Sequence, residues 1–288
     1  MKQGNSKSIK AVLLNLAKQK NVQFQQIVTR YLHERLLYRV SMSEYKLNFV
    51  LKGGNLMYAI EGLQIRPTTD IDMLAKNINN DQDNIKQIFK NICEIKYKDD
   101  CVIFNSKTIA ASEIAEENKY SGVRLLIDTQ FDTIRQAIQI DIGFADIITP
   151  DAVSLSFPVL LKELNAPDIL AYSIETVIAE KFHAMITLGN ANSRMKDLFD
   201  TYILLKNNEI EDIYLAKAIA VTFKERNVIH EENPAFFTES YCNNENRIIM
   251  WKAFLRKIKY PENLDFSVVV KYITERLYPI YLNLITIK

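Results

Sequence analysis

The stretch Lys52–Asp72 reads KGGNLMYAIEGLQIRPTTDID and contains the features that decide the fold. A short apolar run, Leu47–Leu51, comes before two adjacent glycines, which predicts a buried strand that ends in a sharp turn. We expect a short helix over Asn55–Ile60, closed by Gly62. A second strand follows over Thr68–Leu74. The stretch therefore predicts a strand–turn–helix–strand unit.

The paired glycines Gly53 and Gly54 suit a phosphate group as well as a turn. Glycine gives the backbone the freedom that a sharp strand-to-helix turn requires. It also lets a phosphate approach the backbone N–H groups at the start of the helix, where the helix dipole favours an anion. An isolated Gly-Gly pair is more often only a turn, so the phosphate interpretation depends on the acidic residues nearby.

Three aspartates form a candidate metal site. Asp70 and Asp72 occupy alternate positions of a strand and therefore face one side, while Ile71 faces the core. In the string Ile138–Ile142, IQIDI, the isoleucines alternate with polar residues, so Asp141 faces outward or towards a cleft. If the two strands are neighbours, their carboxylates offer the oxygen ligands that Mg²⁺ prefers. The alternative for each aspartate is an ordinary solvated strand acid.

The composition indicates a globular, soluble protein. The chain has 288 residues, enough for one large domain or two of ordinary size, with 48% hydrophobic and 25% charged residues. Its formal net charge of +1 does not favour nucleic acid, so such a partner needs a local basic patch. Three scattered cysteines suit reduced thiols in a cytoplasm. We find neither a secretory signal nor an apolar stretch long enough to span a membrane.

The remaining sequence predicts a mixed α/β domain followed by a helical domain. Residues 6–40 and 81–92 have helical spacing, and Pro150, Pro158 and Pro167 punctuate the stretch before the later helices. We therefore place a domain boundary near residue 165, with domains 1–165 and 166–288. The expected middle strands are Cys101–Phe104, Lys107–Ala111, Val123–Thr129 and Ala137–Gly143. The expected later helices are Ile174–Leu188 (capped by Ser173 and ended by Gly189), Ser193–Leu205, Ile213–Lys224, Glu245–Ile258 and Ser267–Leu277, with Pro279 ending or kinking the last.

This combination of motifs resembles the polymerase-β-like nucleotidyltransferase superfamily. It is more closely similar to the AbiEii/AbiGii family, the nucleotidyltransferase toxins of type IV toxin–antitoxin systems. The resemblance covers about residues 45–205, and five motifs in the right order make it specific. The motifs are FVLKGGN (Phe49–Asn55), RPTTDID (Arg66–Asp72), IQIDIGFAD (Ile138–Asp146), ETVIAEKFHAM (Glu175–Met185) and RMKDLFDTYIL (Arg194–Leu204).

The resemblance implies a metal-dependent nucleotidyltransferase with a mixed-sheet catalytic domain. Asp70, Asp72 and Asp141 then hold two Mg²⁺ ions, with Mn²⁺ as an alternative, and an NTP is the substrate. Lys181 and Asp197 of the helical domain then belong to the active site, and the alternative is a structural Lys–Asp pair in a helical hairpin. The resemblance also implies nucleotide contacts from Lys52, Gly53, Gly54, Asn55, Arg66 and Thr69.

The chain departs from the family pattern in two places. Asn55 stands where the family usually has Ser or Thr, and its amide offers a different donor to a phosphate oxygen. The segment between Gly54 and Asp70 is longer than in minimal members of the superfamily, so its extra residues are expected to reshape the nucleotide pocket. Neither departure removes a charged catalytic position.

Four further residues have open roles. Arg66 and Arg124 are candidates for charge stabilisation or ordinary surface arginines, and Arg66 is preferred because it lies just before the DxD strand. Asp200, three residues past Asp197, is either a partner of the active site or a solvated helix acid. His183 has no second histidine at zinc-binding spacing, which favours a packed or surface residue.

The resemblance makes the 3′ end of tRNA the first choice of acceptor for the transferred nucleotide. Lys252, Arg256 and Lys259 form a basic helix face that suits an RNA backbone, although such a face is more often simply solvated. The alternatives are transfer to a protein or small molecule, and a non-catalytic nucleotide-binding module. The family also implies a role in phage defence and a separate AbiEi-like antitoxin that regulates transcription.

Overall fold

The computed structural model describes residues 5–114, 122–144, 148, 150–228 and 231–286. The chain divides into two compact units. The first unit comprises Met1–Ile147 and Ala152–Tyr172, and the second comprises Ile148–Asp151 and Ser173–Lys288. The main division therefore lies between Tyr172 and Ser173 rather than near residue 165. Ala145 and Asp146, the end of one sequence motif, lie outside the described residues.

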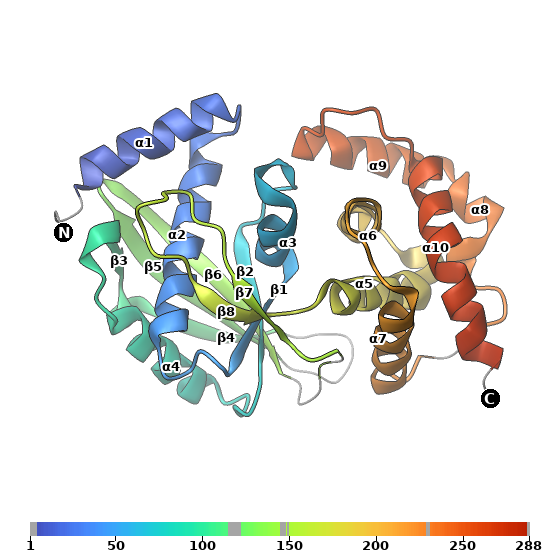
Figure 1. The fold of residues 1–288 in the computed structure, drawn as a ribbon, viewed down its shortest axis with the longest axis horizontal. Helices are drawn as coiled ribbons and strands as arrows, with labels where there is room; N and C mark the ends of the chain where they lie inside the picture. Colours follow the sequence, from blue (N-terminus) through green and yellow to red (C-terminus); the bar gives the residue numbers. More distant parts are fainter. Residues whose placement is uncertain (1–4, 115–121, 145–147, 149, 229–230, 287–288) are drawn as a thin grey trace. The chain divides into compact units, whose positions relative to one another are not determined.

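A mixed sheet forms the frame of the first unit, which confirms the expected α/β class (Figure 1). Within the described residues it has eight strands in the order β3-β5-β6-β2-β1-β8-β7, with β4 paired to β5. β1 runs antiparallel to β2 and parallel to β8, while β2 runs parallel to β6. The strands are β1 (Phe49–Lys52), β2 (Asp70–Ala75), β3 (Val102–Phe104), β4 (Ala110–Ile114), β5 (Gly122–Phe131), β6 (Ile134–Phe144), β7 (Val153–Ser156) and β8 (Asp168–Ala171).

The predicted strand–turn–helix–strand unit is confirmed. β1 leads directly into a helix that begins at Gly53 and is closed by Gly62, whose φ is 79°. Ile71 is fully buried, while Asp70 and Asp72 on either side of it are half-buried, as alternation along a strand requires. The four helices of the first unit are α1 (Ser6–Gln19), α2 (Phe24–Met42), α3 (Gly53–Glu61) and α4 (Gln82–Glu94).

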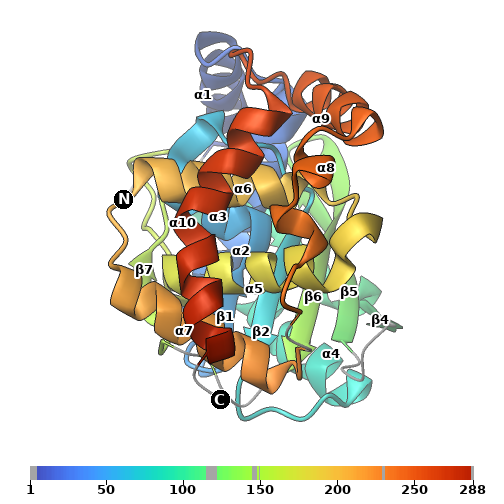
Figure 2. The same cartoon turned by 90° about the vertical axis from the view of Figure 1, so that its right-hand side faces the viewer.

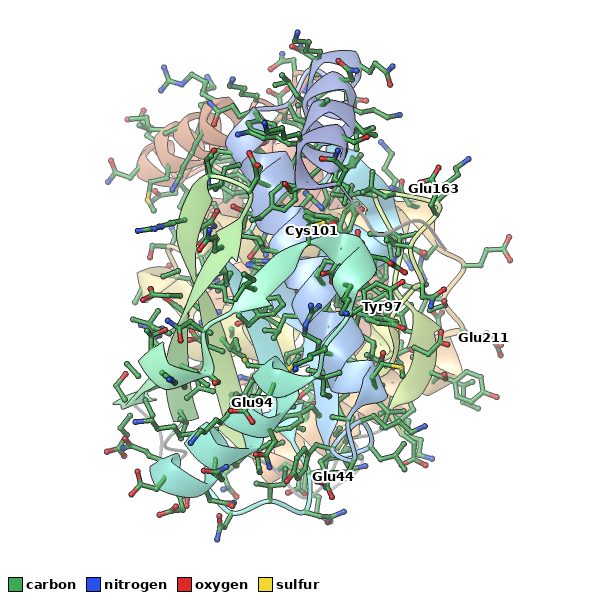
Figure 3. The ribbon with its side chains drawn as sticks, turned by 90° about the vertical axis from the view of Figure 1, so that its left-hand side faces the viewer. Glu44, Glu94, Tyr97, Cys101, Glu163 and Glu211 are labelled. Atoms are coloured by element: carbon green, nitrogen blue, oxygen red, sulfur yellow. The ribbon has the colours of Figure 1, made fainter. Side chains whose placement is uncertain are left out.

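Helix α2 is buried along most of its length, and its charged side chains have specific partners. Figure 3 shows Tyr97 and Cys101 on the segment that follows α4. Within this segment the ring of Tyr97 lies 4.7 Å from the ring of Tyr38 on α2. Asp100 forms a 2.7 Å ion pair with Arg39 of α2. The ring contact and the ion pair together hold the segment against the helix. The buried charge of Arg39 in particular needs Asp100, because a buried charge is costly without a counter-charge.

The described part of the second unit is helical, as predicted (Figure 2). Ser173 caps the first of these helices by accepting a hydrogen bond from the backbone N–H of Thr176, and Gly189 ends it with φ 45°. Aromatic side chains fill the core, among them Phe182, Phe199 and Trp251. The helices of eight residues or more are α5 (Ile174–Leu188), α6 (Met195–Asn207), α7 (Asp212–Glu225), α9 (Glu245–Ile258) and α10 (Phe266–Thr286), and α8 (Glu239–Cys242) is a single turn.

Several predicted boundaries are wrong for identifiable reasons. The helical stretch 6–40 is two helices, α1 and α2, because Asn21 adopts a left-handed conformation between them, with φ 51°. The predicted strand Lys107–Ala111 begins instead at Ala110, after a 3₁₀ turn over Ser106–Thr108. Of the two outcomes expected at Pro279, ending or kinking the helix, the first is wrong: α10 continues to Thr286, with Leu277 and Tyr281 buried on either side of the proline.

The sequence analysis did not predict strand β8. It has only four residues, and it directly follows Pro167 in a stretch interrupted by prolines, which is typical of a loop. It is a core strand nevertheless, with Ile169 and Ala171 buried. Val50 and Leu51 of β1 pair with Leu170 and Ala171 of β8. None of the described helices is both long enough and apolar enough to cross a membrane.

Candidate active site

Three carboxylates converge on one face of the sheet in the first unit. β2 lies beside β6 in the sheet (Figure 1). The register of this pair places Asp72 directly beside Asp141. One carboxylate oxygen from each of Asp70, Asp72 and Asp141 lies within 4.8 Å of the other two. Burial raises the pKa of Asp72, and the neighbouring charge of Asp70 raises it further. The three carboxylates concentrate negative charge at a partly desolvated position. A divalent cation bound there would neutralise this charge.

The glycine turn lies in direct contact with this cluster. Gly53 has φ +66°, and a Cβ atom at this position would collide with the carboxylate of Asp72. The backbone N–H of Gly54 donates a hydrogen bond to Asp72, which partly offsets its raised pKa. A Cβ atom at Gly54 would collide with the side chain of Thr68. Both glycines are therefore required by the close approach of the turn to the acidic residues.

Asn55 differs from the expectation that its amide faces a phosphate. Its side chain is only 1% exposed, and its Nδ2 donates to the backbone carbonyl of Asp70 at 2.7 Å. Its amide group also lies within hydrogen-bond distance of Nδ1 of His33, at 3.2 Å from Nδ2. Burial lowers the pKa of His33 to about 4, so this imidazole is neutral at ordinary pH. Asn55 thus links α2 to the first residue of the DxD strand.

We predict that Asn55→Ala destabilises the protein. The substitution leaves the Asp70 carbonyl and the fully buried His33 without a shared partner, which costs about 1–3 kcal/mol of unfolding free energy. Denaturant titration checks this value, with the exposed Asn91→Ala as a control that changes it by less than about 0.5 kcal/mol. Equal unfolding free energies for Asn55→Ala and the parent protein would contradict the linking role.

The loop before β2 contributes a residue that sequence reasoning missed. Thr68 donates a hydrogen bond from Oγ1 to Oδ1 of Asp70 at 2.6 Å. Thr68 and Asp70 are only two residues apart, so the closeness of a hydroxyl donor to this carboxylate in the sequence was the available signal. Thr69, which we expected at the nucleotide, is exposed, and Arg66 is half-buried.

Two basic residues lie beside the acidic cluster. Lys52 ends β1 directly opposite Asp72, and its charge lowers the pKa of that aspartate against the effect of burial. Arg124 of β5 lies opposite Asp141 and forms a two-point ion pair with it, with distances of 2.8 Å from Nε and 2.7 Å from the terminal nitrogen. Arg124 is therefore an immediate neighbour of the site rather than an isolated surface arginine.

The predicted residues of the helical domain form a cluster of their own within the second unit. The ammonium of Lys181 on α5 lies 2.9 Å from Asp197 and 2.8 Å from Asp200, both on α6. Arg194 also pairs with Asp197. Burial alone raises the pKa of Asp197, but Lys181 and Arg194 outweigh that effect and hold it below its usual value. Asp200 is thus a buried partner of Lys181 rather than a solvated acid.

His183, two residues after Lys181 on α5, is a packed histidine. It is 8% exposed, and its ring stacks edge-on against Phe223 at 6.1 Å. Burial lowers its pKa to about 4. On α9 the predicted basic face is present only in part. Lys252 and Arg256 are exposed while Trp251 and Leu255 are buried, but Lys259 follows the end of the helix in a left-handed conformation, with φ 54°.

The family model for the nucleotidyl transferase AbiEii toxin of type IV toxin–antitoxin systems matches residues 35–272. The fold is thus that of a nucleotidyltransferase. The chain belongs to the AbiEii family of nucleotidyltransferase toxins. Residues 1–34, which include α1, precede the match.

Two solved structures are similar to this chain over most of its length. One is a protein from H. pylori assigned as a nucleotidyltransferase, with 13% identity, a TM-score of 0.49, and coverage of 93% of this chain and 99% of the other. The other is JHP933 from Helicobacter pylori, with 14% identity, a TM-score of 0.49, and coverage of 92% and 95%. No curated protein matches the chain.

Proposed function

We propose that this protein transfers a nucleoside monophosphate from an NTP to a hydroxyl at the 3′ end of tRNA. The observation that carries the proposal is the convergence of Asp70, Asp72 and Asp141 within 4.8 Å beside a glycine turn, in a member of a nucleotidyltransferase toxin family. The acceptor oxygen forms a bond to the α-phosphorus, the bond to the β-phosphate oxygen breaks, and pyrophosphate leaves. The proton of the hydroxyl passes to Asp141 or to solvent.

The donor set fits divalent cations such as Mg²⁺ or Mn²⁺. It consists of carboxylate oxygens alone. Because residue 53 is a glycine, no Cβ atom collides with the carboxylate of Asp72. Asp70 and Asp72 would hold both ions and Asp141 one of them. When bound, such ions lower the pKa of the attacking hydroxyl and neutralise charge on the leaving group.

The remaining residues would bind and orient the triphosphate. The turn at Gly53 and Gly54 brings backbone close to the anionic substrate, and Lys52 adds a positive charge next to Asp72. The family resemblance implies that Lys181 and Asp197 also serve the reaction, with the ammonium of Lys181 offsetting negative charge on the triphosphate. In the second unit Asp197 and Asp200 fix the position of the Lys181 ammonium.

A labelling experiment tests this function. Purified protein is incubated with total RNA and each of the four α-labelled NTPs in turn, with and without Mg²⁺. We expect one or more nucleotides to label the tRNA band only when the cation is present. Labelled protein or a labelled small molecule would instead support the alternative acceptors, and no transfer to any acceptor would leave only a nucleotide-binding module.

The exposed basic face of α9 supports an RNA acceptor. We predict that the double substitution Lys252→Glu and Arg256→Glu raises the KM for RNA about tenfold at low salt and reduces its salt dependence, because fewer phosphate contacts release counterions. The control is Lys217→Glu with Lys224→Glu on α7, which makes the same charge change on another exposed surface. Equal effects of the two double variants would exclude a specific role for α9.

The biological setting is also proposed from the family. A type IV toxin acts with a separate antitoxin, here expected to be an AbiEi-like transcriptional regulator, and phage defence is the associated role. An NTP-dependent reaction on tRNA places the protein in the cytoplasm.

A further inference from the structure

Arg124 is held at the acidic cluster by the register of a β-hairpin. It lies directly opposite Asp141, and its two nitrogens reach Oδ1 and Oδ2 of that residue separately. Nε2 of Gln139 lies 3.1 Å from each of the same oxygens. Both oxygens of the third carboxylate are therefore engaged by donors from the protein itself.

The charges of the cluster favour this position of the guanidinium. One carboxylate oxygen each of Asp70 and Asp72 lies within 4.8 Å of an oxygen of Asp141, so their charges also attract the guanidinium that pairs with Asp141. Arg124 thus interacts with all three members of the cluster. One guanidinium offsets part of their negative charge, as an internal counter-ion does.

The same position conflicts with a cation on Asp141. A divalent ion must take a lone pair from an oxygen that already accepts from Arg124, and two positive charges that share one carboxylate repel each other. The side chain of Arg124 is 41% exposed and that of Asp141 is 17% exposed. The arginine can therefore leave towards solvent without opening the core, whereas Asp141 is held on its strand.

We propose that Arg124 is an internal counter-ion that competes with a divalent cation for Asp141 and, once displaced, binds a phosphate group of the nucleotide substrate. A guanidinium makes two parallel hydrogen bonds to a phosphate with the geometry that it uses on a carboxylate, so the exchange preserves its bonding. The cation half of the proposal concerns only the acidic cluster, while the phosphate half rests on the proposed nucleotidyl transfer. Nucleotide and cation then bind cooperatively, because each relieves the cost of displacing the arginine.

Mn²⁺ binding without nucleotide or RNA tests the first half. Free Mn²⁺ is measured by electron paramagnetic resonance in titrations of the parent protein, Arg124→Gln, Arg124→Lys and Arg135→Gln. We expect Arg124→Gln to bind Mn²⁺ about three- to tenfold more tightly, with Arg124→Lys in between because it keeps the charge and loses the two-point geometry. Arg135 is exposed on the same strand as Asp141, roughly 20 Å along it, and its substitution should change nothing.

An unchanged or weaker Mn²⁺ affinity in Arg124→Gln would overturn the competition. Asp141→Asn should lose Mn²⁺ affinity in the same titration, which verifies that the signal comes from this cluster. Thermal unfolding of each variant shows whether the fold is intact, and Arg124→Lys keeps the test valid if Arg124→Gln does not fold.

NTP binding at saturating Mn²⁺ tests the second half. We expect the Kd for the preferred NTP to rise about tenfold in Arg124→Gln and to recover partly in Arg124→Lys. Tighter Mn²⁺ binding with an unchanged Kd for NTP would overturn the phosphate role and leave the competition in place. If labelling finds no transfer to RNA, the proposed function fails while the Mn²⁺ result stands by itself, so the two failures are distinguishable.

Discussion

Replacing Asp70 or Asp72 by asparagine is expected to lower nucleotidyl transfer by about 10³-fold or more without destabilising the fold. Asparagine has nearly the shape of aspartate but no charge, so it weakens cation binding and leaves the strand in place. The adjacent Ile71 is fully buried and keeps β2 in its register between β1 and β6. The loss of activity should therefore come from the site alone.

The stability of these variants separates a functional role from a structural one. Burial and the charge of Asp70 raise the pKa of Asp72, which means that the ionised Asp72 is less favourable in the folded protein than in the unfolded chain. This cost is present above the folded pKa and disappears as the pH falls and the carboxyl is protonated. Asp72→Asn removes it, so its Tm at neutral pH should equal or exceed that of the parent protein.

Labelled-nucleotide transfer and thermal unfolding on the same preparations check this prediction. Asp128→Asn is the matched control, because Asp128 is exposed on β5 of the same sheet, and it should keep both activity and Tm. Near-normal transfer by Asp70→Asn or Asp72→Asn would refute the metal assignment. A large fall in Tm together with lost activity would instead assign these residues to the fold.

The local pattern of the chain was enough to predict which carboxylates form the candidate site. The glycine pair, the alternation around Ile71 and the IQIDI string each depend on residues within a few positions of one another. Placing Asp141 beside Asp72 required only that β2 and β6 be neighbours, and their parallel pairing provides this. The sequence therefore predicted which carboxylates meet.

The contacts around the carboxylates join residues that lie well apart in the sequence. The local spacing of apolar residues does not predict which of them meet. Arg124 meets Asp141 because a two-residue turn at Asp132 and Thr133, with Asp132 at φ 52°, sets the register of the β5–β6 hairpin. Asn55 turns inward because His33 of α2, which precedes the family motifs, lies beside it. The sequence predicted a phosphate contact for Asn55 and left the role of Arg124 open, and only the packing of other elements shows the partners of these two side chains.

Replacing Lys181 by methionine is expected to have the largest effect on stability, a loss of about 3–5 kcal/mol of unfolding free energy. The Lys181 ammonium lies between Asp197 and Asp200, whose side chains are 3% and 0% exposed. Methionine fills most of the volume but removes the positive charge that lies between the two buried carboxylates. Arg194 pairs with Asp197 and still offsets its charge. Denaturant titration measures the loss directly.

A compensating variant decides whether Lys181 also serves the reaction. In Lys181→Met with Asp200→Asn, one of the two facing charges is gone and Asp197 keeps Arg194, so much of the lost stability should return. If Lys181 offsets charge on the triphosphate, transfer by this double variant stays at least about 10²-fold below that of the parent protein. Asp200→Asn alone is the control and should retain most activity, because Lys181 still pairs with Asp197. Recovery of transfer together with stability would mean that Lys181 only holds two helices together.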